Sequence, residues 1–209
     1  MTISKEQLIT WLDKTADVMQ KNREYLTELD AAIGDADHGI NMDRGFSKVK
    51  EKLPTVADKD LGTIFKTVGM TLMSSVGGAS GPLYGTFFMK AGMALMGKEA
   101  LAAEDLLTFV DNGVGGILQR GRAEVGDKTM FDVWAPVLEG IKGGVAAGKS
   151  APELVADAVP GAEKALEGTI PLQAKKGRAS YLGERSIGHP DPGATSSTLM
   201  LKTLLDVLA

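Results

Sequence analysis

Apolar residues recur at helical spacing along most of the chain, and no stretch sustains the strict apolar–polar alternation of a half-buried strand. The first helical pattern covers residues 5–33. Ser4 precedes it, and Ser4 and Gln7 have the spacing of a helix-capping box. Its apolar side chains recur almost every turn, at Leu8, Leu12, Met19, Leu26, Leu29 and Ile33. This stretch therefore predicts one long helix.

Similar patterns predict further helices over residues 39–52, 60–75, 82–95, 103–119 and 128–146. A seventh helix begins after Ser150, which forms a second capping box with Glu153. The last helix covers residues 193–208. We interpret the methionines of the third and fourth helices as core residues. The pattern predicts an all-α bundle of eight helices, without a sheet, in one domain over residues 1–209.

The order of the helices predicts where the connecting segments lie. If neighbouring helices run up and down, the first, third, fifth and seventh links share one end of the bundle. These four links carry the unusual residues: an acidic turn, a glycine-rich stretch, an Arg/Asp/Lys stretch and a long segment over residues 170–192. The other three links are ordinary turns. We therefore predict a functional site at one end.

Composition excludes several classes of protein. The 209 residues carry a net charge of -4, so there is no basic surface typical of nucleic-acid binding. There is no cysteine, which excludes disulfides and thiolate metal sites. No apolar run approaches the roughly 20 residues that cross a membrane, and the first residues are too polar for a signal peptide. We expect a cytoplasmic protein that binds neither nucleic acid nor membrane.

The acidic turn is the strongest candidate for chemistry. It has the sequence Gly34-Asp35-Ala36-Asp37-His38-Gly39, and Asp30 lies one turn upstream. Three carboxylates so close together repel one another unless a cation lies between them, and Mg²⁺ prefers oxygen ligands. An EF-hand is excluded, because its glycine and glutamate positions hold Ile40 and Phe46. A solvated turn is the alternative.

The other links suit a phosphate ligand. The glycines at 77, 78, 81 and 85 precede or begin the fourth helix, whose free N–H groups favour an anion, although close helix packing would also explain them. In the seventh link, Arg178 or Arg185 could fork onto a phosphate, and His189 suits a structural role. In the fifth link, Met130 could pack on a planar base or belong to the core. Together the links favour a metal-bridged polyphosphate.

Four motifs in this order resemble the nucleotide-binding L subunits of dihydroxyacetone kinases, over essentially the whole chain. They are Gly34-Asp35-Ala36-Asp37-His38-Gly39, Ser74-Ser75-Val76-Gly77-Gly78-Ala79-Ser80-Gly81-Pro82, Gly126-Asp127-Lys128-Thr129, and Lys176-Gly177-Arg178-Ala179-Ser180-Tyr181-Leu182-Gly183 followed by Asp191-Pro192-Gly193-Ala194. The resemblance implies an eight-helix up-and-down antiparallel barrel with a nucleotide site at one end. It also implies a bound ADP or ATP and two Mg²⁺ held by Asp30, Asp35 and Asp37.

By the same resemblance, Arg178 stabilises the charge of the phosphoryl group. The other residues that the resemblance assigns to the nucleotide are His38, Asn41, Ala79, Ser80, Gly121, Met130, Asp191, Pro192 and Gly193. The implied enzyme is a phosphoenolpyruvate-dependent kinase. Its tightly bound ADP is rephosphorylated by an M subunit of the phosphotransferase system and passes the phosphoryl group to dihydroxyacetone on a K subunit.

Other functions are open at this point. An ATP-exchanging kinase subunit would use the same site, and the residues do not choose between a phosphocarrier and free ATP as the donor. A non-catalytic co-regulator would use the same end of the bundle to bind a transcriptional regulator. A metal-dependent phosphohydrolase is less favoured, because no base is placed to activate water. We also expect a homodimer.

Overall fold

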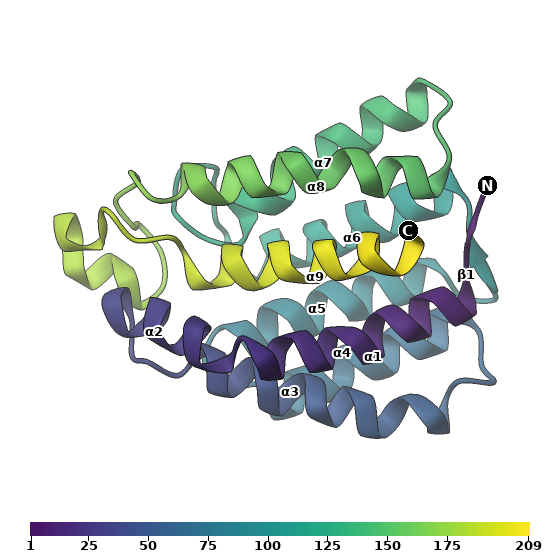
Figure 1. Cartoon of the computed structure of the whole chain (residues 1–209), viewed down its shortest axis with the longest axis horizontal. Coiled ribbons are helices and arrows are strands. Elements are labelled where there is room, and N and C mark those ends of the chain that lie inside the picture. The colour runs from purple at the N-terminus through teal and green to yellow at the C-terminus, as the bar shows by residue number, and fades with distance from the viewer.

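The computed structural model describes all 209 residues and consists mainly of α-helices that follow its long axis (Figure 1). The helices are α1 Lys5–Lys21, α2 Arg23–Ile33, α3 His38–Lys52, α4 Leu61–Ser75, α5 Ser80–Ala94, α6 Ala103–Gly121, α7 Phe131–Ala146, α8 Ala151–Gly168 and α9 Pro192–Leu208. Two short 3₁₀ helices, η1 Leu53–Thr55 and η2 Arg178–Ser186, lie in the links. The predicted all-α class is confirmed. None of the helices has the length and apolar character needed to cross a membrane.

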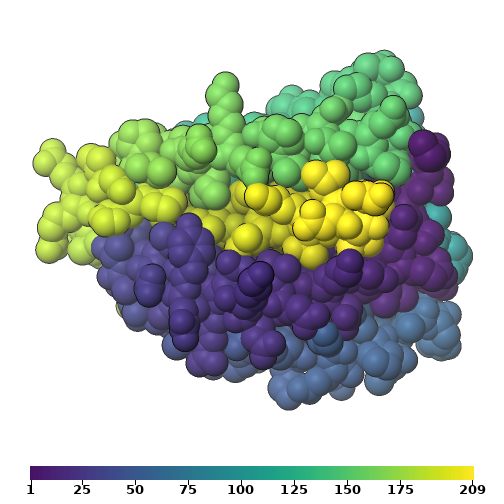
Figure 2. All heavy atoms as spheres, viewed as in Figure 1, coloured from purple at the N-terminus to yellow at the C-terminus, as the bar shows by residue number.

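The helices enclose one hydrophobic core. Each helix from α3 to α8 packs against the next one in the chain, and α1 packs against both α3 and α9. The last helix therefore lies beside the first, between α1 and α8, as the outer surface also shows (Figure 2). The buried hydrophobic residues form a single cluster, in which aromatic rings of α1, α4, α5, α6 and α7 contact one another.

The predicted long helix over residues 5–33 is broken at Asn22. The Asn22 side chain donates a hydrogen bond to the Val18 carbonyl at 2.8 Å, and its backbone leaves helical geometry with φ -97° and ψ 10°. An asparagine side chain competes in this way with the backbone bonds of a helix. As a result, α1 ends at Lys21 and α2 begins at Arg23.

The prediction that the chain has no sheet is also wrong, in a minor way. Strands β1 Ile3–Ser4 and β2 Ala100–Leu101 pair antiparallel, with Ile3 opposite Leu101 and Ser4 opposite Ala100. Two residues are too few to produce an alternating pattern, so the sequence gives no signal for them. This pair fixes the N-terminus at the end of the bundle far from η2 (Figure 1).

Glycines bring α4 and α5 close together. A Cβ atom at Gly69 would lie 2.6 Å from the Gly85 carbonyl oxygen, and one at Gly85 would lie 2.9 Å from the Gly69 carbonyl oxygen. The two helices therefore pack backbone against backbone. The interpretation of their methionines as core residues is wrong for three of them, whose side chains are exposed: Met70, Met73 and Met93.

The four links with unusual residues meet at one end of the bundle. Residues of the α2–α3 turn, the α4–α5 link, the α6–α7 link and the segment between α8 and α9 all border one cavity. The last segment, predicted as a loop over residues 170–192, contains η2. We call residues 169–191 the α8–α9 segment.

Candidate functional site

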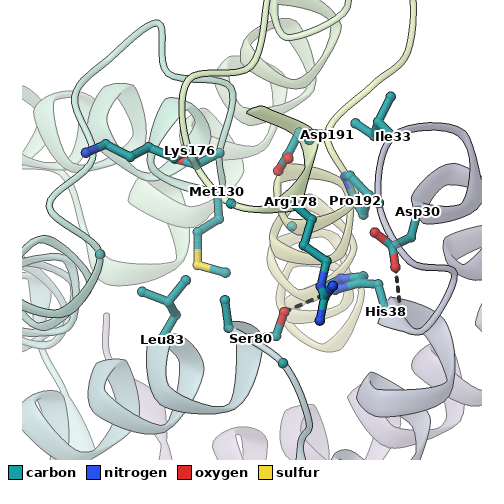
Figure 3. A pocket seen from close by; sticks show the side chains of 18 of the residues that line it. Asp30, Ile33, His38, Ser80, Leu83, Met130, Lys176, Arg178, Asp191 and Pro192 are labelled. Atoms are coloured by element: carbon teal, nitrogen blue, oxygen red, sulfur yellow. Dashed lines mark hydrogen bonds between the residues drawn. The ribbon is translucent and has the colours of Figure 1, made fainter. Parts of the chain in front are cut away.

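The cavity has a volume of about 260 Å³ and is bordered by residues of η2, at one end of the bundle. Figure 3 shows it from close by. It brings together residues that lie as far apart in sequence as Asp30 and Gly193. Of the metal and nucleotide residues that the resemblance implies, all except Asn41 line it: Asp30, Asp35, Asp37, His38, Ala79, Ser80, Gly121, Met130, Arg178, Asp191, Pro192 and Gly193.

The three predicted metal ligands converge at one side of the cavity. Asp30, Asp35 and Asp37 each offer a carboxylate oxygen, and these oxygens lie within 4.8 Å of one another. Asp30 has a second role, because its Oδ2 accepts hydrogen bonds from the backbone N–H groups of Asp37 at 2.8 Å and His38 at 3.1 Å. Asp30 thereby ties the end of α2 to the first turn of α3 and fixes the distance between the acids.

The turn between the acids has an unusual backbone. Ala36 adopts φ +61°, a left-handed conformation that costs a non-glycine residue on the order of 1 kcal/mol. The strain is local and lies directly between Asp35 and Asp37. Such backbone strain concentrates at functional sites, which agrees with a ligand role for the two neighbouring carboxylates.

Arg178 reaches the acids from the α8–α9 segment. It begins η2, and its Nε forms an ion pair with Asp35 Oδ2 at 2.7 Å. The guanidinium is 71% exposed, so the pair gains little stability from its charge. A planar guanidinium can instead bind a phosphate with two parallel hydrogen bonds. In this position Arg178 supplies positive charge next to the acidic cluster.

His38 forms the floor between the acids and α5. Its ring is buried, its Nδ1 lies 3.1 Å from Ser80 Oγ, and its Nε2 lies 2.9 Å from Ser196 Oγ. Burial lowers the pKa of the imidazole to about 4, and nearby Asp37 opposes this shift only in part. His38 is therefore neutral at pH 7, with one ring nitrogen as donor and the other as acceptor.

The glycine-rich link divides into two parts. Gly77 and Gly78 line the cavity, and Gly78 has φ +63°, which favours glycine. Gly81 and Gly85 do not line it. A Cβ at Gly81 would lie 2.2 Å from the Val76 carbonyl oxygen, and Gly85 serves the contact between α4 and α5. The suggestion that all four glycines let a ligand approach is wrong for these two, and helix packing explains them.

Asn41 lies behind the cavity wall. It is buried on α3, where its Oδ1 accepts a hydrogen bond from Arg44 Nη2 at 2.6 Å. A Cβ at Gly77 would lie 2.7 Å from Asn41 Oδ1, so this side chain packs directly against the glycine-rich link. Asn41 therefore supports the link from behind instead of lining the cavity.

The side of the cavity away from the acids is apolar. Met130 is buried at the end of the α6–α7 link, and its side chain faces Leu83 across the cavity (Figure 3). Gly121 and Ile117 of α6 complete this wall. The cavity therefore has a charged side and an apolar side.

Asp191 and Lys128 are two buried titratable residues at the ends of the links that border the cavity. Asp191 begins α9, where its Oδ2 accepts from the Ala194 N–H at 2.7 Å, and burial raises its pKa to about 7. Lys128 Nζ donates to the carbonyls of Leu172 at 3.0 Å and Ser186 at 2.7 Å, with a longer bond to Ile170 at 3.3 Å. Burial lowers the pKa of Lys128.

No role for Lys128 follows from the sequence alone. The only signal was its place in Gly126-Asp127-Lys128-Thr129, because its partners are carbonyls 42 to 58 residues further along the chain. Lys128 itself has φ +62° and is 1% exposed. It holds the α8–α9 segment, and with it Arg178, against the α6–α7 link.

Fold and cavity together define an all-α protein with an acidic, glycine-lined site at one end of the bundle. Residues 32–206 match the family described as the DAK2 domain, and the chain belongs to this family. The resemblance seen in the sequence motifs is confirmed.

Three known proteins illustrate the relationship. The chain is 54% identical to "PEP-dependent dihydroxyacetone kinase, ADP-binding subunit DhaL" of Escherichia coli strain K12, over 98% of this chain and 97% of that protein. It is 44% identical to the ADP-binding subunit of the PTS-dependent dihydroxyacetone kinase of Lactococcus lactis, over 96% of each. The dihydroxyacetone kinase of C. freundii in its native form has a similar structure, with a TM-score of 0.72 and 25% identity. The match covers 95% of this chain and 34% of that kinase.

Proposed function

We propose that this chain is the ADP-binding subunit of a phosphoenolpyruvate-dependent dihydroxyacetone kinase. The observation that carries the proposal is the two-sided cavity: three carboxylates and Arg178 on one side, Met130 and Leu83 on the other. A nucleoside diphosphate has the same division into a charged and a planar part. The relatives that match nearly the whole chain are named as ADP-binding subunits of such kinases, which supports the same role.

The acids fit Mg²⁺ as the metal. Asp30, Asp35 and Asp37 provide only oxygen ligands, which is the donor set that Mg²⁺ prefers. ADP carries about -3 and the three acids add a further -3, so two Mg²⁺ with Arg178 would bring the site close to neutral. The three carboxylates would hold the Mg²⁺, which would supply positive charge to offset that of the phosphates.

The chain's own residues position the nucleotide. We infer that Met130 packs on the base, that Ser80 with the backbone of Ala79 and Gly78 contacts the phosphates at the start of α5, and that Asp191, Pro192 and Gly193 border the base or ribose. Arg178 would exchange its bond to Asp35 for a phosphate oxygen. No residue of this chain needs to form a covalent intermediate.

The partners follow from the same proposal. An M subunit would rephosphorylate the bound ADP to ATP, and the terminal phosphoryl group would pass to dihydroxyacetone on a K subunit, which leaves ADP bound again. Both partners have to approach the mouth of the cavity, where η2 presents Tyr181, which is 88% exposed. A homodimer and a complex with a transcriptional regulator would have to leave this mouth free during catalysis.

The first experiment tests the nucleotide and the metals together. The chain is purified without added nucleotide and denatured in acid, and the released nucleotide and metal are measured. We expect about one ADP and about two Mg²⁺ per chain. An empty protein that exchanges ATP reversibly would overturn the bound-cofactor proposal in favour of an ATP-exchanging subunit, and one that binds no nucleotide would overturn the kinase function.

Asp35→Ala tests the acidic cluster itself. The variant removes one of three ligands, and we expect nucleotide content to fall to below about a tenth of the wild-type level while helical circular dichroism is kept. Asp58→Ala is the matched control, because Asp58 is an exposed aspartate that pairs only with Lys59 at the other end of the bundle. Unchanged ADP content in Asp35→Ala would refute the metal role.

A further inference from the structure

A chain of buried polar side chains leads from the core to the cavity. Trp134 Nε1 donates to Ser197 Oγ at 3.1 Å, and Ser197 Oγ lies 2.8 Å from the Tyr84 hydroxyl. Tyr84 lies 2.8 Å from Ser196 Oγ, which lies 2.9 Å from His38 Nε2. The chain ends where His38 Nδ1 meets Ser80 Oγ at 3.1 Å, at the cavity wall. Figure 3 shows this last contact from the cavity side.

At the buried end of this series of hydrogen bonds, the donor and acceptor of each bond can be assigned. An indole N–H can only donate, so Ser197 accepts from Trp134 and has its own hydrogen free for Tyr84. Tyr84 then accepts from Ser197 and donates onward. Ser196 at 2.8 Å is a better acceptor position than the Gly193 carbonyl at 3.3 Å, so the Tyr84 hydrogen points to Ser196.

At the cavity end, the hydrogen bonds run in the same direction, toward the cavity, if the cavity holds a phosphate. Phosphate oxygens accept hydrogen bonds, so Ser80 has to donate its hydroxyl hydrogen to them. Ser80 Oγ then accepts from His38 Nδ1–H, which leaves His38 Nε2 as the acceptor for Ser196. Ser196 Oγ also lies 3.1 Å from the Gly193 carbonyl oxygen, but His38 Nε2 is nearer at 2.9 Å and is the better acceptor position for its hydrogen. With this assignment, each hydroxyl accepts one hydrogen bond and donates one.

We propose that Trp134, Ser197, Tyr84 and Ser196 are positioning residues that hold His38 as the Nδ1–H tautomer, so that the Ser80 hydroxyl donates to the nucleotide phosphate. The proposal rests on the proposed function, since it needs an acceptor in the cavity. All four residues are fully buried or nearly so, and none of them lines the cavity. Their route to the phosphates runs through His38 and Ser80. Tyr84 and Ser196 also contact the Gly193 carbonyl, at the part of the cavity wall that borders the base or ribose.

The first test needs no variant. The chain has two histidines, so ¹⁵N-edited NMR of the nucleotide-loaded protein shows two imidazole rings, and His189→Gln identifies which signal belongs to His38. We expect the Nδ1–H tautomer at His38. An Nε2–H tautomer would overturn the proposal, because Ser80 would then donate to the ring and not to the ligand. Nucleotide content measured on the same sample separates this result from failure of the proposed function.

The second test is a double-mutant cycle between Tyr84→Phe and Ser80→Ala. Tyr84→Phe removes the hydroxyl that sets the direction of Ser196, and we expect Mg-ADP affinity to fall about tenfold. In the Ser80→Ala background the same change should have a much smaller effect, because the route from Tyr84 to the phosphate is already lost. An equal loss in both backgrounds would mean that Tyr84 acts only on the fold, and would refute the proposal.

Two further variants control for folding. Ser197→Ala breaks the chain one step deeper with a smaller change of volume, and we expect a mixture of tautomers at His38 with a weaker loss of affinity. Thr203→Val removes a buried hydroxyl of α9 that bonds only to the Leu199 carbonyl. It should leave both tautomer and affinity unchanged, and a change equal to that of Tyr84→Phe would contradict a specific chain.

Discussion

Asp191 shows how one side chain serves the fold and the site at once. Its carboxylate caps α9 by accepting the Ala194 N–H, which places Pro192 and Gly193 at the cavity wall. The same position is buried, with Asp132 and Asp30 nearby, and its pKa rises to about 7. The contribution of this capping side chain to the free energy of unfolding therefore depends on pH.

The sign of this dependence follows from the raised pKa. Between the ordinary value of 3.8 and about 7, the folded protein binds a proton at Asp191 that the unfolded chain releases. The stability that this proton contributes is complete at low pH and is lost as the pH rises to about 7. Asp191→Asn keeps a capping oxygen and removes the titration. Relative to wild type, the variant should gain on the order of 2–3 kcal/mol between pH 5 and pH 8 in urea denaturation.

Asp60→Asn is the control for this prediction. Asp60 caps α4 by accepting the Thr63 N–H at 2.6 Å, but it is not buried and hydrogen bonds to backbone N–H groups lower its pKa. It is ionised in both states above pH 5, so its variant should show the same stability difference from wild type at pH 5 and pH 8. If the two asparagine variants behave alike, burial of Asp191 does not govern its proton.

Individual residues also mark the limit of what the sequence could predict. The acids, Arg178 and Met130 could be assigned to one site because their motifs fall in links that an up-and-down bundle brings to one end. Asn41 follows His38 by three residues in the sequence, yet its side chain packs behind the glycine-rich link and does not line the cavity. Tyr84 and Ser196 meet across 112 residues through a contact that no local pattern encodes.

At the scale of the element, helices were predicted well and their interruptions were not. The apolar pattern located each long helix, because a buried stripe repeats over many turns. The break at Asn22 depends on one side-chain hydrogen bond, and the apolar pattern continues across it. The pairing of β1 with β2 joins residues almost a hundred positions apart.

A single buried lysine bonds to both ends of the α8–α9 segment. The ammonium of Lys128 donates to carbonyls at both ends of the stretch that carries Arg178. Lys128→Met keeps the length of the side chain but leaves these buried carbonyls without a donor. We expect faster amide hydrogen exchange over residues 172–188 and a loss of about 2 kcal/mol or more in stability, with α4 and α5 still protected.

Lys142→Met provides the comparison. Lys142 is an exposed lysine of α7 that pairs with Glu139, so its loss should change stability by less than about 0.5 kcal/mol and leave exchange in the α8–α9 segment unchanged. Equal exchange in Lys128→Met and Lys142→Met would show that the segment is held by other contacts.

At the scale of the whole molecule, one core connects every long helix. The chain was predicted to form a single domain over residues 1–209, and the buried cluster extends from Ile3 to Leu204. The packing of α9 on α1 joins the two ends of the sequence through Trp11, whose Nε1 donates to the Met200 carbonyl at 2.9 Å. We therefore propose that no part of the bundle unfolds independently.

The two tryptophans allow this to be measured. Trp11 lies in α1 and Trp134 in α7, so Trp11→Phe and Trp134→Phe each leave one reporter in a different part of the core. In urea, each variant should show the same midpoint by tryptophan fluorescence as by circular dichroism at 222 nm, as a two-state transition requires. Separate midpoints within one variant would indicate two domains.

The packing of α9 against α1 also determines where a linker or a label can be joined without covering the cavity. Helix α9 starts at the cavity with Pro192 and runs 17 residues away from it, about 25 Å at the rise of an α-helix. The N-terminus lies at the same far end, where the Met1 carbonyl accepts from the Ala151 N–H (Figure 1). A linker, a label or a neighbouring domain joined at either terminus therefore extends away from the mouth. Tethering the chain by its C-terminus to a surface would present the nucleotide end to partners in solution.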